Sequence, residues 1–267
     1  MPMHARCVGL LALWVAMSAA VRLRHPLQVR GRRSQIFMNK RSQNAARSPT
    51  AYIELMEDGS DMWRAQEALA ILKAGGCGVI PTDTSYSFVT PISSKAGAQR
   101  ILEFKGAGSE KKPLSILCRS LGDIEHYTKG MTREGFKMLR AHLPGAFTFI
   151  VPASQHLPKG LYKDGKRAWK RDSVGVRIPD DPVCAAVLAE LDEPLLCSSV
   201  PTTEDGDQLI CNRLPLDGHG SASWCNRVDF VLDAGQRPSD GSSVYDLTGD
   251  EGHIVLVREG LGQLVVY

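Results

Sequence analysis

The stretch that most constrains the fold is residues 75–89, which read GGCGVIPTDTSYSFV. Two glycines end a helix-like segment, and the apolar run at 77–80 has the composition of a short buried strand. Pro81 then interrupts this run, and because proline fixes its own φ and donates no backbone hydrogen bond, the chain turns rigidly there. Hydroxyl and carboxyl side chains follow at 82–86, at a strand end where α/β sheets open their ligand crevices. We expect a strand-to-loop corner that is either an ordinary polar turn or part of a ligand site.

Charge is unevenly distributed along the 267 residues. The first 53 residues contain nine Lys and Arg and no acid before Glu54, although the formal net charge of the whole chain is only +3. From Glu54 onward, the remaining 23 of the 32 basic residues stand against all 29 acidic ones. A polyanion site on the folded part must therefore be a local basic patch.

The N-terminal segment has the composition of a targeting sequence. Residues 1–20 resemble a signal peptide, because a short basic start precedes the apolar run at 7–15 and small residues follow it. Residues 21–53 are rich in Arg, Ser, Gln and Asn and free of acids, which is typical of a disordered transit peptide. Together they favour a plastid, with a mitochondrion or the secretory pathway as alternatives. We expect a folded domain at 54–267 and no stable membrane anchor after leader removal.

Beyond the leader, helix-like and strand-like segments alternate and then give way to strands alone. Apolar residues recur at helical spacing after Ser60, after Ser93, over 132–143 and over 181–191. Short apolar runs predict strands at 77–80, 85–90, 114–118, 146–151, 173–178, 195–199, 229–232, 243–247 and 254–258. This order predicts a single α/β domain in which helices pack on an open, twisted, mixed sheet.

The cysteines give no sign of a metal site. No Cys-x-x-Cys pair occurs among the seven, and no histidine stands at metal-ligand spacing beside them. Cys77, Cys118 and Cys197 fall in apolar strand-like runs, so we expect small buried hydrophobic residues there. A Cys211–Cys225 disulfide is compatible with the sequence, but nothing requires it.

Five motifs occur in a characteristic order. They are PTDTSY (81–86), Lys105 ahead of KKPL (111–114), PGAFTF (144–149), VGVRIP (174–179) and a strand ending in Ser198 and Ser199. In this order and spacing they resemble the YrdC-like family, which includes the threonylcarbamoyl-adenylate synthases, and residues 242–262 extend the similarity. The resemblance implies one YrdC-like α/β domain with a concave, locally basic cleft.

The resemblance also implies a reaction and a set of residue roles. Family enzymes join ATP, L-threonine and bicarbonate into threonylcarbamoyl-adenylate, release pyrophosphate and so feed a tRNA modification. Mg²⁺ would travel with ATP as part of the substrate, and no tightly bound cofactor or protein-held metal is expected. Negative charge builds on the phosphates during such a transfer, so fixed cations and donors are needed. The implied catalytic residues are Lys105 and Ser199, and the implied substrate and nucleotide contacts are Thr82, Thr84, Tyr86, Lys112, Thr148 and Arg177.

Two signature positions depart from the synthases. Their Lys-x-Arg motif ends here in Ala107, and their Ser-Ala-Asn motif ends in Pro201. Losing one charged donor where charge develops costs ~10²–10³ in rate. The pattern is closer to the YciO-like branch, whose members keep the fold and diverge in this site. For Arg177 and Lys105, a surface ion pair and a solvated helix end are the plain alternatives.

A basic segment at 158–172 supports a different class of function. Tyr162 and Trp169 are interleaved there with six cationic residues, Lys159, Lys163, Lys166, Arg167, Lys170 and Arg171. Such a segment can bind RNA phosphates and stack on bases, and the family has been linked to double-stranded RNA, so tRNA or duplex RNA is the expected partner. A solvated loop is the alternative. Three hypotheses therefore stay open: a synthase, a catalytically silent RNA-binding or regulatory module, and a related ATP-dependent carbamoyl transfer.

Overall fold

The computed structural model describes residues 50–104, 113–158, 172–201, 224–249 and 253–264, together with the backbone of residues 163–164 and 167–168. All of these belong to one compact unit, residues 46–267. The signal-like segment at 1–20 and most of the transit-like segment at 21–53 lie outside the described residues. The first strand, β1 (Ala51–Glu54), begins ahead of Glu54, where the sequence placed the start of the domain.

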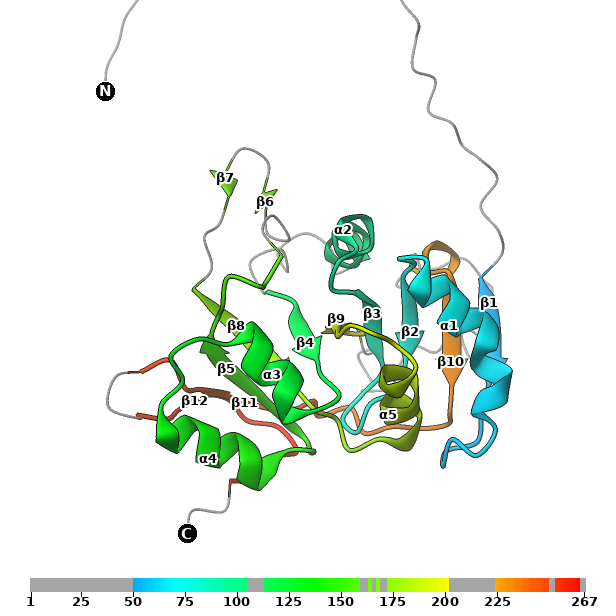
Figure 1. Ribbon diagram of the computed structural model, residues 1–267. Coiled ribbons are helices and arrows are strands. Elements are labelled where there is room, and N and C mark those ends of the chain that lie inside the picture. Colours follow the sequence, from blue (N-terminus) through cyan, green and yellow to red (C-terminus); the bar gives the residue numbers. More distant parts are fainter. Residues whose placement is uncertain are drawn as a thin grey trace, which may run out of the picture. The chain divides into compact units, whose positions relative to one another are not determined.

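The alternating segments form one large mixed sheet (Figure 1). Its ten described strands lie in the order β1-β10-β2-β3-β9-β4-β8-β5-β11-β12. After β1 their bounds are β2 (Gly78–Ile80), β3 (Ser87–Pro91), β4 (Ser115–Leu117), β5 (Phe147–Pro152), β8 (Ser173–Arg177), β9 (Leu195–Ser199), β10 (Phe230–Asp233), β11 (Ser243–Asp246) and β12 (Val255–Arg258). Parallel pairs such as β4 with β8 stand beside antiparallel pairs such as β3 with β9. The mixed α/β sheet predicted from the sequence is confirmed.

The basic segment contributes a second, separate sheet. Strands β6 (Lys163–Asp164) and β7 (Arg167–Ala168) pair antiparallel with one another and with no strand of the large sheet among the described residues. In Figure 1 this hairpin stands apart from the large sheet.

A 3₁₀ turn precedes α1, and a capping side chain precedes each of the other described α-helices. α1 (Gln66–Lys73) continues from a 3₁₀ turn, Met62–Ala65, and the chain after it turns at Gly75, whose φ of +83° is one that glycine adopts without strain. The other helices start behind a side chain that accepts a backbone N–H: Ser94 before α2 (Lys95–Phe104), Ser120 before α3 (Leu121–Tyr127), Thr132 before α4 (Arg133–His142) and Asp181 before α5 (Pro182–Ala189). Helix α3 was missing from the sequence-based prediction.

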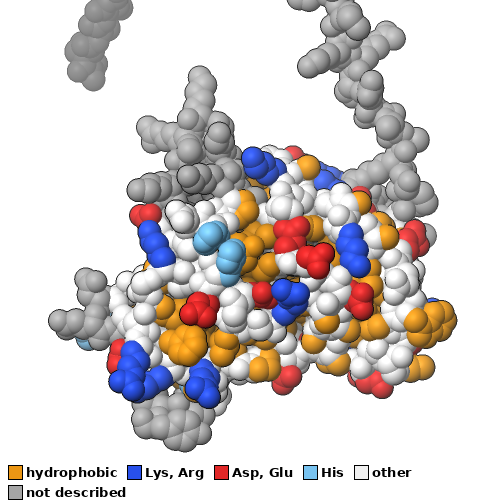
Figure 2. All heavy atoms as spheres, in the orientation of Figure 1, with side chains coloured by type: hydrophobic (Ala, Val, Ile, Leu, Met, Phe, Trp, Pro, Cys, Tyr) orange, Lys and Arg blue, Asp and Glu red, His pale blue; other side chains and the backbone are white. Residues whose placement is uncertain are grey.

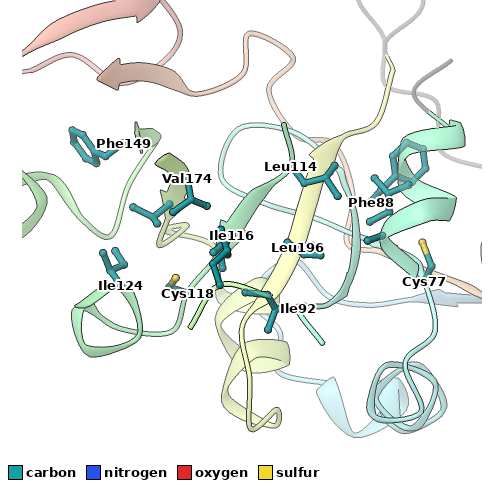
Figure 3. Close-up of a cluster of buried hydrophobic side chains, with 14 of the residues drawn as sticks. Cys77, Phe88, Ile92, Leu114, Ile116, Cys118, Ile124, Phe149, Val174 and Leu196 are labelled. Atoms are coloured by element: carbon teal, nitrogen blue, oxygen red, sulfur yellow. The ribbon is translucent and has the colours of Figure 1, made fainter. Parts of the chain in front are cut away.

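Alternation along the strands sends side chains into two hydrophobic cores. Phe88, Ile116 and Phe149 belong to the first core, with residues of α2, α3 and α4 (Figure 3). Val89 and Leu117, the next residues along the same strands, belong to the second core with α1 and α5. Because neighbouring strand residues point to opposite faces, each core covers one face of the sheet.

The surface and the cysteines add two observations. On the face shown in Figure 2, acidic and basic side chains of the described residues are interspersed. Cys77, Cys118 and Cys197 are buried, as predicted, and burial raises the pKa of the Cys118 thiol well above its ordinary value. Cys211 lies outside the described residues, so the structure does not test a bridge between Cys211 and Cys225. No helix within the described ranges is long and apolar enough to span a bilayer.

Candidate functional site

Side chains of the corner between β2 and β3 hold the turn together. The hydroxyl of Thr82 donates to the carbonyl oxygen of Ser85 at 2.6 Å, and the N–H of Thr82 donates to the same oxygen at 3.0 Å. The N–H of Ser85 in turn donates to Thr82 Oγ1 at 3.3 Å. Thr82 and Thr84 are both fully buried. The corner is therefore a rigid turn, and the Thr82 hydroxyl is engaged in maintaining it.

Strand β8 ends beside the corner and brings Arg177 to it. The guanidinium nitrogen Nη2 donates to Asp83 Oδ1 and to Thr84 Oγ1, each at 2.8 Å. The second carboxylate oxygen of Asp83 accepts the N–H of Asp180 at 3.1 Å. The Arg177 and Asp83 side chains are 5% and 8% exposed. Arg177 therefore belongs to a buried ion pair, and part of its charge is already compensated.

The Asp83 carboxyl is under opposing electrostatic influences. Burial raises its pKa, and the nearby charge of Arg177 together with the N–H of Asp180 lowers it by a smaller amount. The pKa of Asp83 therefore lies above its ordinary value.

On the sheet face that carries Arg177, small and polar residues lie beside apolar residues of the second core, such as Leu117. Ser199 pairs with Ser87, and Ser115 pairs with both Cys197 and Gly175, so all these residues share one face. A Cβ atom added at Gly175 would lie 2.7 Å from Ser115 Oγ and 3.2 Å from Thr148 Cγ2. Glycine at this position therefore lets the hydroxyl residues of the two adjacent strands come together.

Several polar atoms around this face are buried without a hydrogen-bond partner. Within the part of the chain that the structure describes, they include Ser85 Oγ, Ser87 Oγ and Arg177 Nε. Buried polar atoms are nearly always satisfied, so each such atom calls for an explanation. Two hydroxyls and one guanidinium N–H, all at the corner or the strand beside it, form a consistent set of groups for a polar ligand.

A second arginine approaches the same face from the sheet edge. Thr148 Oγ1 shares a 2.7 Å hydrogen bond with Ser242 Oγ, and Arg258 donates from Nη2 to Ser242 O at 2.5 Å and to Ser242 Oγ at 3.1 Å. Burial and then the positive charge of Arg177 lower the pKa of Arg258. The positive charge of Arg177 therefore acts on Arg258, and a bound anion near both guanidinium groups would offset this repulsion.

A bulge in β12 gives Arg258 its direction. Leu256 pairs with Tyr245, but Arg258 pairs with Val244, so Val257 is an extra residue in the ladder. With regular alternation, the Arg258 side chain would lie on the same face of the sheet as Tyr245. The bulge instead places Arg258 opposite Val244, which pairs with Thr148 on its other side. Sequence reasoning missed Arg258 as a site residue because a bulge reverses the expected face.

Tyr86 is a predicted substrate contact, and its hydroxyl takes part in a buried hydrogen-bond network. That hydroxyl donates to the Gly235 carbonyl at 2.6 Å, lies 3.1 Å from Asp233 Oδ1 and accepts the N–H of Ala234 at 3.0 Å. Burial, and then Asp233, raise the pKa of Tyr86. The Tyr52 hydroxyl donates to the other oxygen of Asp233. We therefore regard Tyr86 as a residue that ties the corner to β10.

The structure brings some predicted residues together and does not describe others. Thr82, Thr84, Thr148, Arg177 and Ser199 all lie at the corner or on the polar face, and Ser199 is exposed at the end of β9. The remaining ones lie outside the described residues or have no described side chain: Lys105, Ala107, Lys112, Lys159, Lys163, Lys166, Arg167, Lys170 and Arg171. Pro201 is exposed just beyond β9.

Two further features of the described residues bear on the site. The described residues include no group of three or more His, Cys, Asp or Glu side chains that could hold a metal ion. A groove of about 490 Å³ lies between α3 and α4, lined among others by Leu121, Lys129, Met131 and Phe136, and none of the predicted site residues lines it. The concave basic cleft thus stays a prediction for the polar face.

Comparison with known proteins identifies the family. The model of the Sua5, YciO and YrdC proteins, described as telomere recombination, matches residues 70–260. The chain belongs to the Sua5/YciO/YrdC family. The residues that match the family model include the whole polar face, from the β2–β3 corner to Arg258.

Individual relatives within the family differ in their similarity. YciO of Escherichia coli strain K12 is 28% identical over 200 residues, which are 74% of this chain and 89% of YciO. The E. coli YciO crystal structure superposes with a TM-score of 0.64 at 26% identity, over 80% of this chain and 97% of that one. Human threonylcarbamoyl-AMP synthase is 31% identical over 132 residues, 49% of this chain and 44% of the enzyme. P. abyssi Sua5 complexed with L-threonine shares the fold, with a TM-score of 0.62 and 24% identity over 79% of this chain and 58% of Sua5.

Proposed function

We propose that the polar face binds a nucleotide together with a small carboxylic acid, and that the chain makes L-threonylcarbamoyl-adenylate from ATP, L-threonine and bicarbonate. The observation that carries this proposal is the set of buried atoms without partners, Ser85 Oγ, Ser87 Oγ and Arg177 Nε, beside a second guanidinium from Arg258. Hydroxyl donors and paired guanidinium groups suit phosphate and carboxylate oxygens.

Each residue has a distinct part in this proposal. Arg177 directs its Nε–H at a ligand anion while Nη2 stays on Asp83 and Thr84, so its orientation is fixed before the ligand arrives. Arg258 is oriented in the same way by Ser242. Negative charge that develops on the phosphates during transfer would meet two preoriented cations in a partly buried setting. Ser87, Ser199 and Thr148 supply hydroxyls for the amino acid or the nucleotide.

Relatives support the choice of substrates. Human threonylcarbamoyl-AMP synthase carries the reaction in its name, and the P. abyssi Sua5 structure holds L-threonine. Lys105 would add a cation for phosphate or carbamate charge, and Mg²⁺ would enter with ATP. Because Ala107 and Pro201 replace an arginine and an asparagine of the synthase signatures, we expect turnover ~10²–10³ below that of a complete site for each lost donor.

Pyrophosphate release from ATP tests this proposal. The full chain should release pyrophosphate only when L-threonine and bicarbonate are both present, and Lys105→Ala should abolish the release. A matched control is Lys129→Ala, a lysine at the α3–α4 groove. Release that does not depend on threonine would point to a different carbamoyl acceptor, and activity that survives Lys105→Ala would refute the role of Lys105. No release with any acceptor would refute the synthase.

The β6–β7 hairpin favours a second candidate function, RNA binding. It places Lys163 and Arg167 on a two-stranded ribbon apart from the large sheet, within a segment of six cationic residues (Figure 1). Cationic side chains on such a ribbon can contact the phosphates of an RNA duplex. A catalytically silent, RNA-binding member of the YciO-like branch would use this ribbon alone.

Duplex RNA binding at several salt concentrations tests the second candidate. Replacement of the six cationic residues by glutamine should weaken binding and flatten the dependence of log K on log salt, by about 0.9 for each lost phosphate contact to a duplex. An unchanged affinity and slope would remove the hairpin from consideration. RNA binding without pyrophosphate release would favour the silent module over the synthase.

A further inference from the structure

Helix α4 presents a basic face with one aromatic residue to the solvent. Four exposed residues lie along it: Arg133, Phe136, Lys137 and Arg140. Their spacing of i, i+3, i+4 and i+7 puts them on one side of the helix. Over α4, at the lower left of Figure 2, basic side chains gather around an apolar patch. Acidic residues outnumber basic ones from Glu54 onward, so this face is a local basic patch on a mildly acidic domain.

The α3–α4 groove opens beside this face. Its volume is about 490 Å³, and four of the residues that line it are apolar: Leu121, Ile124, Met131 and Phe136. Phe136 belongs to both the groove and the basic face, and it is 40% exposed. Arg133 lines the α4 wall of the groove, and Glu125 lines the α3 wall. The groove thus combines an apolar lining with walls of opposite charge.

The cations of this face have no counter-ions among their neighbours. None of Arg133, Lys137 and Arg140 forms an ion pair with another residue in the part of the chain that the structure describes. Guanidinium and ammonium groups in a row on one helix face suit a partner that carries several carboxylates.

We propose that the α3–α4 groove, together with the basic face of α4, binds an acidic amphipathic helix of a partner protein. Apolar residues of such a helix lie in the groove against Phe136 and Ile124, which is a common mode of peptide recognition. Its carboxylates pair with Arg133 and Lys137 on one flank, and Glu125 on the other flank disfavours acidic residues there. The charge pattern of the groove therefore sets the orientation of the bound helix.

The spacing of the cations favours a helix over a small anionic ligand. Arg133 and Arg140 are seven residues apart, which is about 10 Å along the helix axis. A small carboxylate would neutralise one of them, whereas a helix with carboxylates at i, i+4 and i+7 reproduces the spacing of all three cations. A lipid surface is a poorer match, because Phe136 is the one strongly exposed large apolar side chain of α4.

The groove and the polar face lie on opposite sides of the large sheet. Leu139 of α4 and Ile124 of α3 pack in the first core together with Phe149 of β5. Thr148, the residue before Phe149, points to the other side, where its hydroxyl is bonded to Ser242. A helix in the groove would therefore not compete directly with a ligand on the polar face.

Fluorescence anisotropy with the full chain and a labelled synthetic peptide tests the proposal. The probe is a helix of about 15 residues with leucine at i, i+3, i+4 and i+7, glutamate along one flank of that stripe, and alanine and glutamine elsewhere. We expect a dissociation constant on the order of 10 μM that rises with salt concentration. A peptide with lysine in place of each glutamate should bind roughly tenfold more weakly. No binding of the glutamate peptide, or equal binding of the two peptides, would overturn the proposal.

Two variants of α4 and two matched controls locate the binding surface. Phe136→Ala should weaken binding of the glutamate peptide roughly tenfold, because aromatic anchors dominate such interfaces, and the double variant Arg133→Glu, Lys137→Glu should abolish it. Trp63→Ala and Lys73→Glu replace an exposed aromatic residue and an exposed lysine outside the groove, so both should bind as wild type does. An unchanged unfolding midpoint shows that each variant is folded.

Two results with these variants would contradict the proposal. Binding that survives both α4 variants would overturn it by placing the peptide elsewhere. Duplex RNA that displaces the peptide from the wild-type chain, and that loses affinity in Arg133→Glu, Lys137→Glu, would overturn it by assigning the face to nucleic acid.

Discussion

Arg177 donates to Asp83 across 2.8 Å, and the two side chains are almost wholly buried at the corner that follows β2. The pair connects the carboxyl end of β8 to the β2–β3 corner. It also fixes the orientation of the guanidinium whose Nε has no partner among the described residues. In the proposed function, Arg177 is therefore both a member of this ion pair and the cation that binds the ligand.

Arg177→Met should be strongly destabilising. It leaves the Asp83 carboxylate buried without its counter-ion, which costs about 3–5 kcal/mol when one member of a buried pair is removed. Urea unfolding at neutral pH measures the loss. The double variant Arg177→Met, Asp83→Leu should recover much of the stability, because no buried charge is left. A loss below about 1 kcal/mol in the single variant would show that the pair is solvated.

Asp83 should make the free energy of unfolding depend on pH, and the direction of its pKa shift sets the direction of that dependence. Its pKa is raised in the folded state, so the folded chain holds the Asp83 proton more tightly than the unfolded chain. The stability from that proton is present below the unfolded pKa of about 3.9 and is lost as pH rises through the folded pKa. The free energy of unfolding of wild type minus that of Asp83→Asn should therefore fall with rising pH. A difference that rises instead would show that Arg177 outweighs burial.

Ser87→Ala should separate ligand binding from stability. The Ser87 hydroxyl is buried without a hydrogen-bond partner among the described residues, so its removal should leave the free energy of unfolding unchanged or raise it. Ser243→Ala is the matched control, because the buried Ser243 hydroxyl donates to Gly262 O at 2.5 Å and its loss should cost about 0.5–1.5 kcal/mol. Calorimetric binding of ATP with L-threonine should weaken in Ser87→Ala and persist in the control. Equal destabilisation of both variants would contradict this.

Arg258→Gln should reduce ATP affinity at least ~tenfold, because hydrogen bonds to charged ligand groups contribute about 1.5–3 kcal/mol. Its side chain reaches the polar face through Ser242 and lies close enough to Arg177 for their charges to interact. Arg140→Gln, on the exposed side of α4, is the control. Titration calorimetry gives both dissociation constants. Equal affinities would place the phosphates away from β12.

The sequence predicted the elements better than it predicted the site. Apolar periodicity and capping residues located nine of the ten described strands of the large sheet and four of the five described α-helices, because these signals are local. β1 was missed because its short run AYIE lies in a basic, leader-like segment and gains its stability by pairing with β10, far along the chain. α3, of 7 residues, is too short to show a clear period.

Within the site, contacts between residues far apart in the sequence could not be predicted from local patterns. The motifs drew attention to Arg177 and Thr84 as site candidates, but no local pattern shows that Asp83 accepts from Arg177 across 94 residues of sequence separation. The Tyr86 hydroxyl turns to Asp233 and Gly235, contacts that only the folded sheet creates. Arg258 escaped notice because a bulge reverses the face that alternation assigns to it.

The most direct test of the central claim is a crystal structure of the chain grown with a non-hydrolysable ATP analogue and L-threonine. The account predicts phosphate or carboxylate oxygens within about 3.2 Å of Arg177 Nε and of the Ser87 hydroxyl, with Arg258 turned toward the same ligand. Ligand density at another place, such as the α3–α4 groove, with apolar side chains packed over Ser87 and Thr148, would contradict it.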